Sequence, residues 1–376
     1  MRVALGIHHL RPRGGQEDHC IRIAQALLER GHEVTIFSSD DAGDLAIPTV
    51  KVASSGYLRP NHVMAARFSA EFVERTTASF DRTVAFQPTA GVDMVFIGDD
   101  VRNRQDASLL KRLTPRYKTF AALEAGCFGP DSNVRIVGFS ATQMRAFVER
   151  YPDSRSRIAI LPPTLQRERH RPEFRAADRR AAFRKSLGID DGQKAWLWVG
   201  LQPEVKGLDR VLRALVEHRN ARLLICGMQA DHHRARPMHV HIRNLGLQDR
   251  VQFLGYLGGE QYSSVLAAAD VLAHPARREA SGSTILEALV NGLPVVATDV
   301  CGFAAHVEKS GAGIVVPSPF DPAALSQALA EASGEKQEEY SRRGIAYGAD
   351  PYLYSGIETA CDLIEAADRR FPPDPL

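Results

Sequence analysis

Short apolar runs alternate with segments of helical apolar spacing along most of the chain, and this alternation constrains the fold more than any other feature. In the first half, the expected strands are residues 2–7, 34–38, 83–86, 94–97, 134–139 and 158–161. In the second half, they are residues 196–199, 222–225, 251–254, 271–274 and 294–298. Strands that alternate with helices form mostly parallel sheets, so the sequence predicts an α/β fold in both halves.

The length of the chain agrees with two domains. At 376 residues it exceeds the size at which a single hydrophobic core normally stops growing. We expect an N-terminal Rossmann-like domain over residues 1–165 and a second one over residues 166–348, followed by a helix within residues 349–376 that crosses back to the first domain. Ligands of such sheets bind beyond the carboxyl ends of the strands.

Composition excludes several classes of protein. Hydrophobic residues make up 44% and charged residues 24% of the chain, as in ordinary globular enzymes. The sequence has no apolar run long enough to span a bilayer and no signal-peptide pattern at its start, so a cytosolic location is expected. The five cysteines are widely scattered and are interpreted as reduced thiols.

The net charge of +2 argues against a nucleic-acid partner, but two stretches are locally basic. The stretch at 167–185 also contains acidic residues and is interpreted mainly as a solvated interdomain helix, and the overlapping segment at 174–187 has a strongly helical pattern. The first stretch interleaves leucines and aromatic residues with Arg102, Arg104, Lys111, Arg112, Arg116 and Lys118. That pattern fits an amphipathic patch for an anionic membrane surface, and it also fits a solvated basic helix.

The loop after the first strand contains two adjacent glycines, Gly14 and Gly15, directly before a helical segment. Backbone amides at such a helix start can face phosphate or sugar oxygens without obstruction by side chains. The loop lacks the Gly-x-Gly-x-x-Gly pattern of a dinucleotide site. A ligand-binding turn and a tight turn without a ligand therefore both stay open for this loop.

Two acidic residues, Glu279 and Glu287, flank the start of a helix expected at 283–291. Unpaired N–H groups and the helix dipole at 282–284 favour a diphosphate. Carboxylates beside such a site can accept hydrogen bonds from the sugar and ribose hydroxyls at the two ends of a nucleotide sugar. The spacing alone fits a nucleotide-sugar site, and it equally fits two solvated acids around an ordinary helix.

The wider context of these residues resembles the signature of family 4 retaining glycosyltransferases. The Glu-x7-Glu segment follows His-Pro-Ala at 274–276 and precedes Asn-Gly-Leu-Pro-Val at 291–295. In the first half, Gly-Gly-Gln-Glu-Asp-His at 14–19 resembles the N-terminal glycine loop of that family. Within the family, the resemblance over nearly the whole chain is to the bacterial glucosyltransferases that act on the inner-core heptose of lipopolysaccharide.

The resemblance implies a GT-B fold, in which an acceptor domain and a donor domain face each other across a cleft. It implies a retaining, metal-independent hexosyltransferase that moves glucose from UDP-glucose to a lipopolysaccharide core heptose or a similar glycolipid acceptor. No cofactor is implied besides the nucleotide-sugar substrate. The resemblance also favours a membrane contact for the first basic stretch, with the protein peripheral on the inner face of the cytoplasmic membrane.

Roles of individual residues follow from the same resemblance. Glu279 is expected to contact the donor sugar hydroxyls, Glu287 the ribose, and Lys206 the departing diphosphate, whose growing charge it would neutralise. Asp99 and His19 are expected to orient the sugar or the acceptor. The remaining residues expected to bind the donor are Gly14, Gly15, Ser281, Gly282, Ser283 and Thr284.

One position departs from the family pattern. Relatives commonly carry an arginine beside or just ahead of the lysine, whereas Lys206 follows Pro-Glu-Val at 203–205. Either the cationic site is weaker, or Arg277 or Arg278 supplies a second charge. The sequence shows no Asp-x-Asp pair at a strand end and no metal-ligand spacing, so no metal ion is expected. The family mechanism is a front-face displacement in which the leaving phosphate helps to deprotonate the acceptor.

Three alternatives stay open at this stage. A related transferase would use another nucleotide sugar and act on capsule or exopolysaccharide intermediates. A nicotinamide-dependent dehydrogenase would also be built of α/β halves, but it requires a glycine pattern that the first loop lacks. A nucleotide-sugar-binding protein without transferase activity is consistent with the missing arginine near Lys206.

Overall fold

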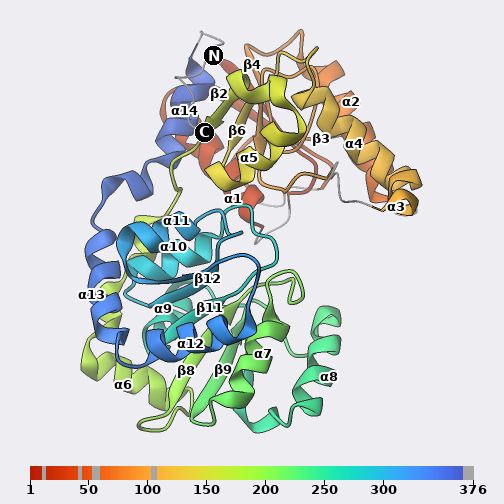
Figure 1. Ribbon diagram of the computed structural model, residues 1–376. Helices are drawn as coiled ribbons and strands as arrows, with labels where there is room; N and C mark the ends of the chain where they lie inside the picture. Colours follow the sequence, from red (N-terminus) through yellow and green to blue (C-terminus); the bar gives the residue numbers. More distant parts are fainter. Residues whose placement is uncertain (11–13, 41–44, 53–59, 103–107, 367–376) are drawn as a thin grey trace. The chain divides into compact units, whose positions relative to one another are not determined.

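A computed structural model describes residues 1–10, 14–40, 45–52, 60–102 and 108–366 of the chain (Figure 1). The chain divides into two compact units. The first consists of Met1–Thr164 together with Tyr354–Leu376, and the second of Leu165–Leu353. Each unit is organised around its own parallel β-sheet, and the two are described separately below.

The sheet of the first unit has the strand order β3-β2-β1-β4-β5-β6-β7 among the described residues. Its strands are β1 (Arg2–Ile7), β2 (Glu33–Ser38), β3 (Thr49–Lys51), β4 (Arg82–Ala85), β5 (Met94–Ile97), β6 (Arg135–Gly138) and β7 (Ile158–Ile160). All neighbouring pairs are parallel. The strand order reverses between β1 and β4, and in such sheets ligands bind beyond the carboxyl ends of the strands at this point.

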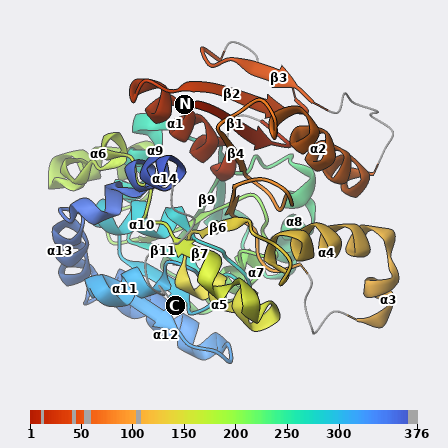
Figure 2. The same ribbon diagram turned by 90° about the horizontal axis from the view of Figure 1, so that it is seen from above.

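Helices cover both faces of this sheet. The helices of this unit are α1 (Gly15–Glu29), α2 (Asn61–Thr76), α3 (Leu109–Leu113), α4 (Pro115–Phe128), α5 (Ala141–Arg150) and α14 (Gly356–Glu365), of which α3 has no buried residue. Val3, Leu5 and Ile7 of β1 pack with α1 and α14, whereas Ala4 packs with α2, α4 and α5, because successive strand residues point to opposite faces. Figure 2 shows α14 beside α1, with α2 and α4 on the other side of the strands.

The second unit repeats this plan with the strand order β10-β9-β8-β11-β12-β13 in the part of the chain that the structure describes. Its strands are β8 (Lys194–Val199), β9 (Ala221–Cys226), β10 (Val251–Gly255), β11 (Val271–His274), β12 (Val295–Thr298) and β13 (Gly313–Val316). All pairs are again parallel, and the order reverses between β8 and β11. This order in both units confirms the prediction of two Rossmann-like domains.

The helices of the second unit are α6 (Ala177–Ser186), α7 (Leu208–Glu217), α8 (Arg236–Asn244), α9 (Gly259–Ala268), α10 (Ser283–Val290), α11 (Ala304–Ser310), α12 (Pro322–Ser333) and α13 (Gln337–Tyr347). One core cluster joins Trp196 and Trp198 of β8 to apolar side chains of α7, α8 and α12. Short 3-10 segments are Pro152–Arg157, Arg167–Arg169, Pro172–Arg175, His233–Ala235, Gln248–Arg250 and Pro351–Tyr354.

One expected helix is interrupted. The sequence pattern at 174–187 predicts continuous helix, but the structure has a 3-10 segment at Pro172–Arg175 and begins α6 only at Ala177. Ala176 between them has φ −52° and ψ 139°, which is not a helical conformation. Arg175 explains the interruption, because its guanidinium turns inward and donates to the carbonyls of Leu266 (2.9 Å), Ala267 (3.3 Å) and Ala269 (3.2 Å) at the end of α9.

Within the described residues, no helix combines the length and the apolar character that crossing a membrane requires.

Candidate functional site

Two of the predicted donor residues meet at the point where the strand order of the second unit reverses. Lys206 lies in the loop between β8 and α7, and Glu279 lies in the loop between β11 and α10. The Lys206 ammonium forms an ion pair with Oε2 of Glu279, and both side chains are largely buried. The structure therefore brings together two residues that are 73 positions apart in the sequence.

A third side chain, His274, completes this cluster. It is the last residue of β11, its side chain is only 2% exposed, and its Nε2 lies 3.0 Å from the same Oε2 of Glu279. The sequence predicts no role for His274, which stands there only as part of the His-Pro-Ala motif. The available signal was a histidine that ends an otherwise apolar strand, Val-Leu-Ala-His.

The surroundings of Glu279 keep its carboxylate charged. Burial favours the neutral acid, but the interactions with His274 and Lys206 outweigh this effect and lower the pKa of Glu279 to about 2. Cys301 is a further buried neighbour, and burial together with the nearby Glu279 charge raises the pKa of its thiol to about 11. Glu279 is thus an ionised hydrogen-bond acceptor at any physiological pH.

Backbone contacts fix the loop that carries Glu279. The Glu279 carbonyl accepts a hydrogen bond from the Gly302 amide at 3.0 Å, and the Ser281 carbonyl accepts one from Phe303 at 2.8 Å. Gly282 follows with φ +92°, a left-handed conformation that favours glycine. A Cβ at Gly282 would also lie 3.1 Å from Cγ of Glu279, so a side chain there would press on the Glu279 side chain.

The helix that follows offers backbone donors beside this carboxylate. Gly282 is the N-cap of α10 and provides no side-chain cap for the helix, so the first amides at Ser283 and Thr284 are not capped by it. Positive charge at a helix N-terminus favours phosphate oxygens. We call Lys206, His274, Glu279 and the start of α10 the donor cluster.

Arg277 holds the two loops of the donor cluster together. It makes a bidentate contact with Asp209 of α7 at 2.7 and 2.8 Å, and it donates to the Glu204 carbonyl at 2.7 Å. The Arg277 amide also donates to the Val205 carbonyl at 2.8 Å. Its charge is therefore engaged in fixing the Lys206 loop. This makes Arg277 less available to bind a diphosphate in place of the missing family arginine.

Glu287 lies one turn inside α10 and is buried. Its Oε1 accepts a hydrogen bond from Arg169 at 2.7 Å, and Arg169 is about half exposed. The Tyr262 hydroxyl is buried nearby, and burial followed by the Glu287 charge raises the pKa of this tyrosine well above its usual range. Asn291 donates to the Glu287 carbonyl at 2.7 Å and to the Arg169 carbonyl at 2.9 Å. Glu287 and the segment of Arg169 are thus tied together.

The remaining predicted site residues belong to the first unit. Gly14 is the N-cap of α1, and a Cβ there would collide with the Glu17 carboxylate, which folds over it. Gly15 begins the helix in open space. His19 packs on the Phe139 ring, and its Nε2 lies 2.6 Å from the Thr164 hydroxyl. Burial, followed by the charge of Arg22, lowers the pKa of His19 to about 4, so its ring is neutral near pH 7.

Asp99 follows β5 and its side chain is 62% exposed. Its carboxylate forms an ion pair with Arg102, whose guanidinium also lies 4.5 Å from the centre of the Phe120 ring of α4. The Asp99 carbonyl accepts a hydrogen bond from the buried Gln143 side chain at 2.9 Å. Arg102 therefore links a predicted catalytic acid to the basic stretch.

The basic stretch exposes apolar residues next to its charges. Leu109, Leu110 and Leu113 of α3 are 78%, 81% and 65% exposed. The charged residues alongside are Lys111 and Arg112 on α3 and Arg116 and Lys118 on α4, while Arg104 lies outside the described residues. We call these leucines and the four described bases the α3 patch.

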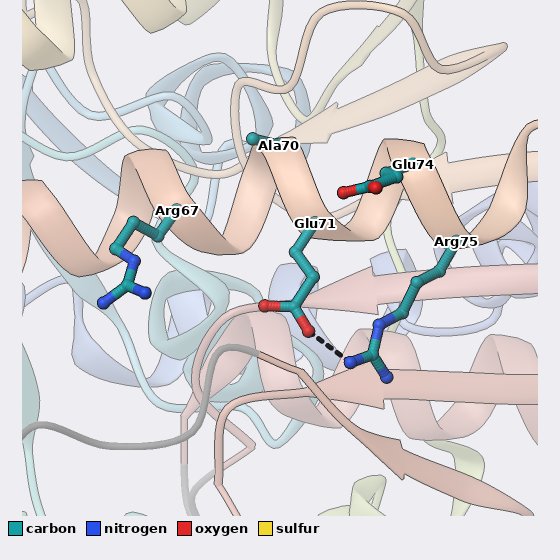
Figure 3. A pocket seen from close by; sticks show the side chains of 5 residues that line it. All are labelled: Arg67, Ala70, Glu71, Glu74 and Arg75. Atoms are coloured by element: carbon teal, nitrogen blue, oxygen red, sulfur yellow. Dashed lines mark ion pairs between the residues drawn. The ribbon is translucent and has the colours of Figure 1, made fainter.

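A hollow of about 630 Å³ lies elsewhere on the first unit, along α2. It is lined by Arg67, Ala70, Glu71, Glu74 and Arg75, and Figure 3 shows the ion pair of Glu71 with Arg75 at 2.5 Å. All of these residues come from one helix. Among the described residues, no second element supplies polar groups to this hollow, so it lacks the converging groups that are typical of a binding site.

Comparisons with known proteins agree with the geometry. The family model "Glycosyl transferases group 1" matches residues 179–349, the part of the chain that contains the donor cluster. The lipopolysaccharide glucosyltransferase WaaG of Escherichia coli is 30% identical over 97% of this chain and 98% of its own length.

Solved structures show the same relationship. A crystal structure of WaaG, described as a glycosyltransferase involved in lipopolysaccharide biosynthesis, matches with a TM-score of 0.86 and 28% identity, and covers 97% of this chain and 100% of that one. HepE of Anabaena, solved in complex with UDP-glucose, shares the fold with a TM-score of 0.70 at 17% identity, over 97% of this chain and 98% of its own. With one relative matched along nearly its whole length in both sequence and structure, this chain belongs to the group 1 glycosyltransferases and has their GT-B fold.

Proposed function

We propose that this glycosyltransferase transfers glucose from UDP-glucose, with retention of configuration, to a heptose of the lipopolysaccharide core or to a similar glycolipid. The observation that carries the proposal is the donor cluster, in which a cation, an ionised acid and a free helix start meet beyond the carboxyl ends of β8 and β11. The acceptor class is supported by the name of WaaG, and the donor by the UDP-glucose bound to HepE.

Donor binding requires an exchange of contacts within the cluster. In the structure, Lys206 and Glu279 neutralise each other. A bound diphosphate would draw Lys206 and the α10 amides to its oxygens, and this would release Glu279 to accept hydrogen bonds from the sugar hydroxyls. Glu287 would receive the ribose hydroxyls in place of Arg169, whose half-exposed side chain has room to move away.

The chemical step proposed is a front-face displacement. The bond between the sugar C1 and the diphosphate oxygen breaks while the acceptor hydroxyl oxygen forms its bond to C1 on the same face. The hydroxyl proton passes to the leaving phosphate, and Lys206 stabilises the negative charge that develops there. Asp99 and the neutral His19 would orient the sugar or the acceptor, as the family resemblance implies.

The α3 patch supports a peripheral membrane location, which suits a glycolipid acceptor. Three leucines exposed beside four basic side chains combine apolar burial with attraction to anionic headgroups. Each base near an anionic leaflet contributes about 1 kcal/mol, so the patch is sufficient for reversible attachment. We place the patch at the inner face of the cytoplasmic membrane in this proposal.

Turnover of UDP-glucose by the full chain, with and without a heptose-containing lipopolysaccharide acceptor, tests the proposal. We expect Lys206→Ala and Glu279→Ala each to lower turnover by about 100-fold or more, because each removes a group that acts on the donor. Lys336→Ala and Glu339→Ala provide the control, since these residues form an exposed ion pair of their own at 3.3 Å.

Undiminished turnover in both donor-cluster variants would defeat the site assignment. Turnover of a different nucleotide sugar by the wild-type chain would instead leave the site assignment intact and show that the donor is not UDP-glucose. Binding of UDP-glucose without any turnover would indicate a nucleotide-sugar-binding protein.

A further inference from the structure

Lys206 and His274 contact the same oxygen of Glu279. The Lys206 ammonium and the Nε2 of His274 both lie against Oε2, and among the described residues no donor contacts Oε1. The two neighbours differ in how firmly they are held. Lys206 is on a loop and 21% exposed, whereas His274 is part of β11, is paired in register with Ala297 of β12, and is 2% exposed.

We propose that His274 is a positioning residue that holds Oε2 of Glu279, so that Oε1 points to the donor sugar after Lys206 has moved to the diphosphate. This inference rests on the proposed function, because it assumes a sugar nucleotide in the donor cluster. It adds a residue that acts through Glu279 and does not touch the substrate. Without His274, Glu279 would lose its remaining ligand at the moment when Lys206 leaves.

The surroundings of the two ring nitrogens of His274 determine which of them carries the proton. Nε2 faces the carboxylate, and the buried Nδ1 has no hydrogen-bond partner in the described part of the chain. A proton on Nδ1 would leave a buried donor unsatisfied and would turn the Nε2 lone pair toward a negative oxygen. The proton therefore resides on Nε2, and His274 donates a hydrogen bond to Glu279.

Loss of this hydrogen bond would make the Glu279 carboxylate easier to protonate. The titratable groups that face Glu279 are His274 at the end of β11, Lys206 in the loop after β8, and the Cys301 thiol in the loop after β12. Burial alone raises the pKa of Glu279. With Lys206 engaged by the diphosphate and His274 absent, Glu279 becomes easier to protonate, and a neutral acid accepts hydrogen bonds from the sugar less strongly.

The test compares His274→Phe, which keeps a flat ring but has no donor, with His274→Gln, whose amide nitrogen can take the place of Nε2. Affinities of the full chain for UDP-glucose and for UDP are measured by calorimetry at several pH values between 5 and 8. We expect His274→Phe to bind UDP-glucose about tenfold or more weakly, with a loss that grows as the pH falls. His274→Gln should recover most of the affinity, and in His274→Phe the affinity for UDP, which has no sugar, should fall by less than the affinity for UDP-glucose.

Equal losses for UDP and UDP-glucose, or equal losses in both variants without any dependence on pH, would overturn the positioning role and leave a structural one. Thermal unfolding of each variant identifies a chain that has failed to fold. If His274→Phe does not fold, the affinities of His274→Gln alone decide between the positioning role and a structural one. Failure of the proposed function looks different, because the wild-type chain itself would then bind neither UDP nor UDP-glucose.

Discussion

At the scale of residues, Lys206 and Glu279 of the donor cluster neutralise each other in the absence of a ligand. Glu279 and Lys206 are both largely buried, and each would be costly to leave without a neighbour of opposite charge. Their pairing neutralises both charges, and in our proposal a diphosphate takes over the contact with Lys206 while sugar hydroxyls take over the contact with Glu279. A ligand that offered only a phosphate or only a sugar would leave one of the two residues without its replacement.

The pairing also predicts how stability depends on pH. The pKa of Glu279 is about 2 in the folded chain and near 4.5 when unperturbed. A depressed pKa contributes stability that is fully present above pH 4.5 and is lost as the pH falls toward 2. The difference in unfolding free energy between wild type and Glu279→Gln should therefore be constant between pH 7 and pH 6, and should shrink by about 1–2 kcal/mol at pH 3.

Urea unfolding at each pH measures this difference, and titratable groups that do not contact Glu279 cancel between the two proteins. Glu338→Gln, on an exposed position of α13, is the control and should show no such change. A wild-type advantage that stayed constant to pH 3, or that increased in acid, would contradict the assignment of Glu279 as a buried ionised group.

The sequence predicted the site residues that belong to a recognisable motif, but not the residues that hold them in place. Glu279, Glu287 and Lys206 stand in recognisable contexts, and the structure places Glu279 and Lys206 in contact. His274 ends a strand whose other residues are apolar, so its alignment on Glu279 appears only once the loop has folded back. The contact of Arg277 with Asp209 likewise joins two segments that the sequence keeps 68 positions apart.

At the scale of elements, apolar runs predicted the strands well where both faces are buried. β1, β5 and β11 begin and end where the pattern indicates, and each has nearly continuous buried residues. The edge strands β3 and β13, both only partly buried, were not identified. The interruption before α6 was missed because it depends on the carbonyls that Arg175 caps in a distant helix.

The α3 patch yields a prediction at the same scale. The triple variant Leu109→Ser, Leu110→Ser and Leu113→Ser should bind vesicles that contain phosphatidylglycerol about tenfold or more weakly than wild type, because the apolar contribution to binding is removed while all basic residues stay. The remaining binding should disappear at high salt. Vesicle co-sedimentation measures both effects.

Val216→Ser with Val240→Ser is the matched control, since these residues are exposed to 42% and 44% on helices of the second unit. Loss of binding in this control to the same degree as in the leucine variant would indicate nonspecific adsorption. Wild-type protein that stays in solution with anionic vesicles would rule out the α3 patch as a membrane contact.

At the scale of the whole molecule, the two units share the same sheet topology but carry different functional side chains. Both carry a loop and a helix start after their first strand, but among the described residues only the second unit presents a cation, two buried acids and a left-handed glycine around the switch point of its sheet. The first unit presents the neutral His19, the exposed Asp99 and the α3 patch. This division assigns the nucleotide sugar to the second unit in our proposal, and the glycolipid to the first.

The central claim is that the donor cluster binds a uridine sugar nucleotide, and a thermal-unfolding panel of UDP, UDP-glucose, GDP, ADP and NAD tests it most directly. A ligand at 100 times its dissociation constant stabilises the folded state by about 2.7 kcal/mol, which corresponds to a shift of about 5 °C or more for a domain of this size. We expect such a shift with UDP and UDP-glucose in the wild-type chain, and a loss of the additional effect of the sugar in Glu279→Gln. A shift with NAD, GDP or ADP in place of the uridine nucleotides, or an undiminished response to UDP-glucose in Glu279→Gln, would contradict it.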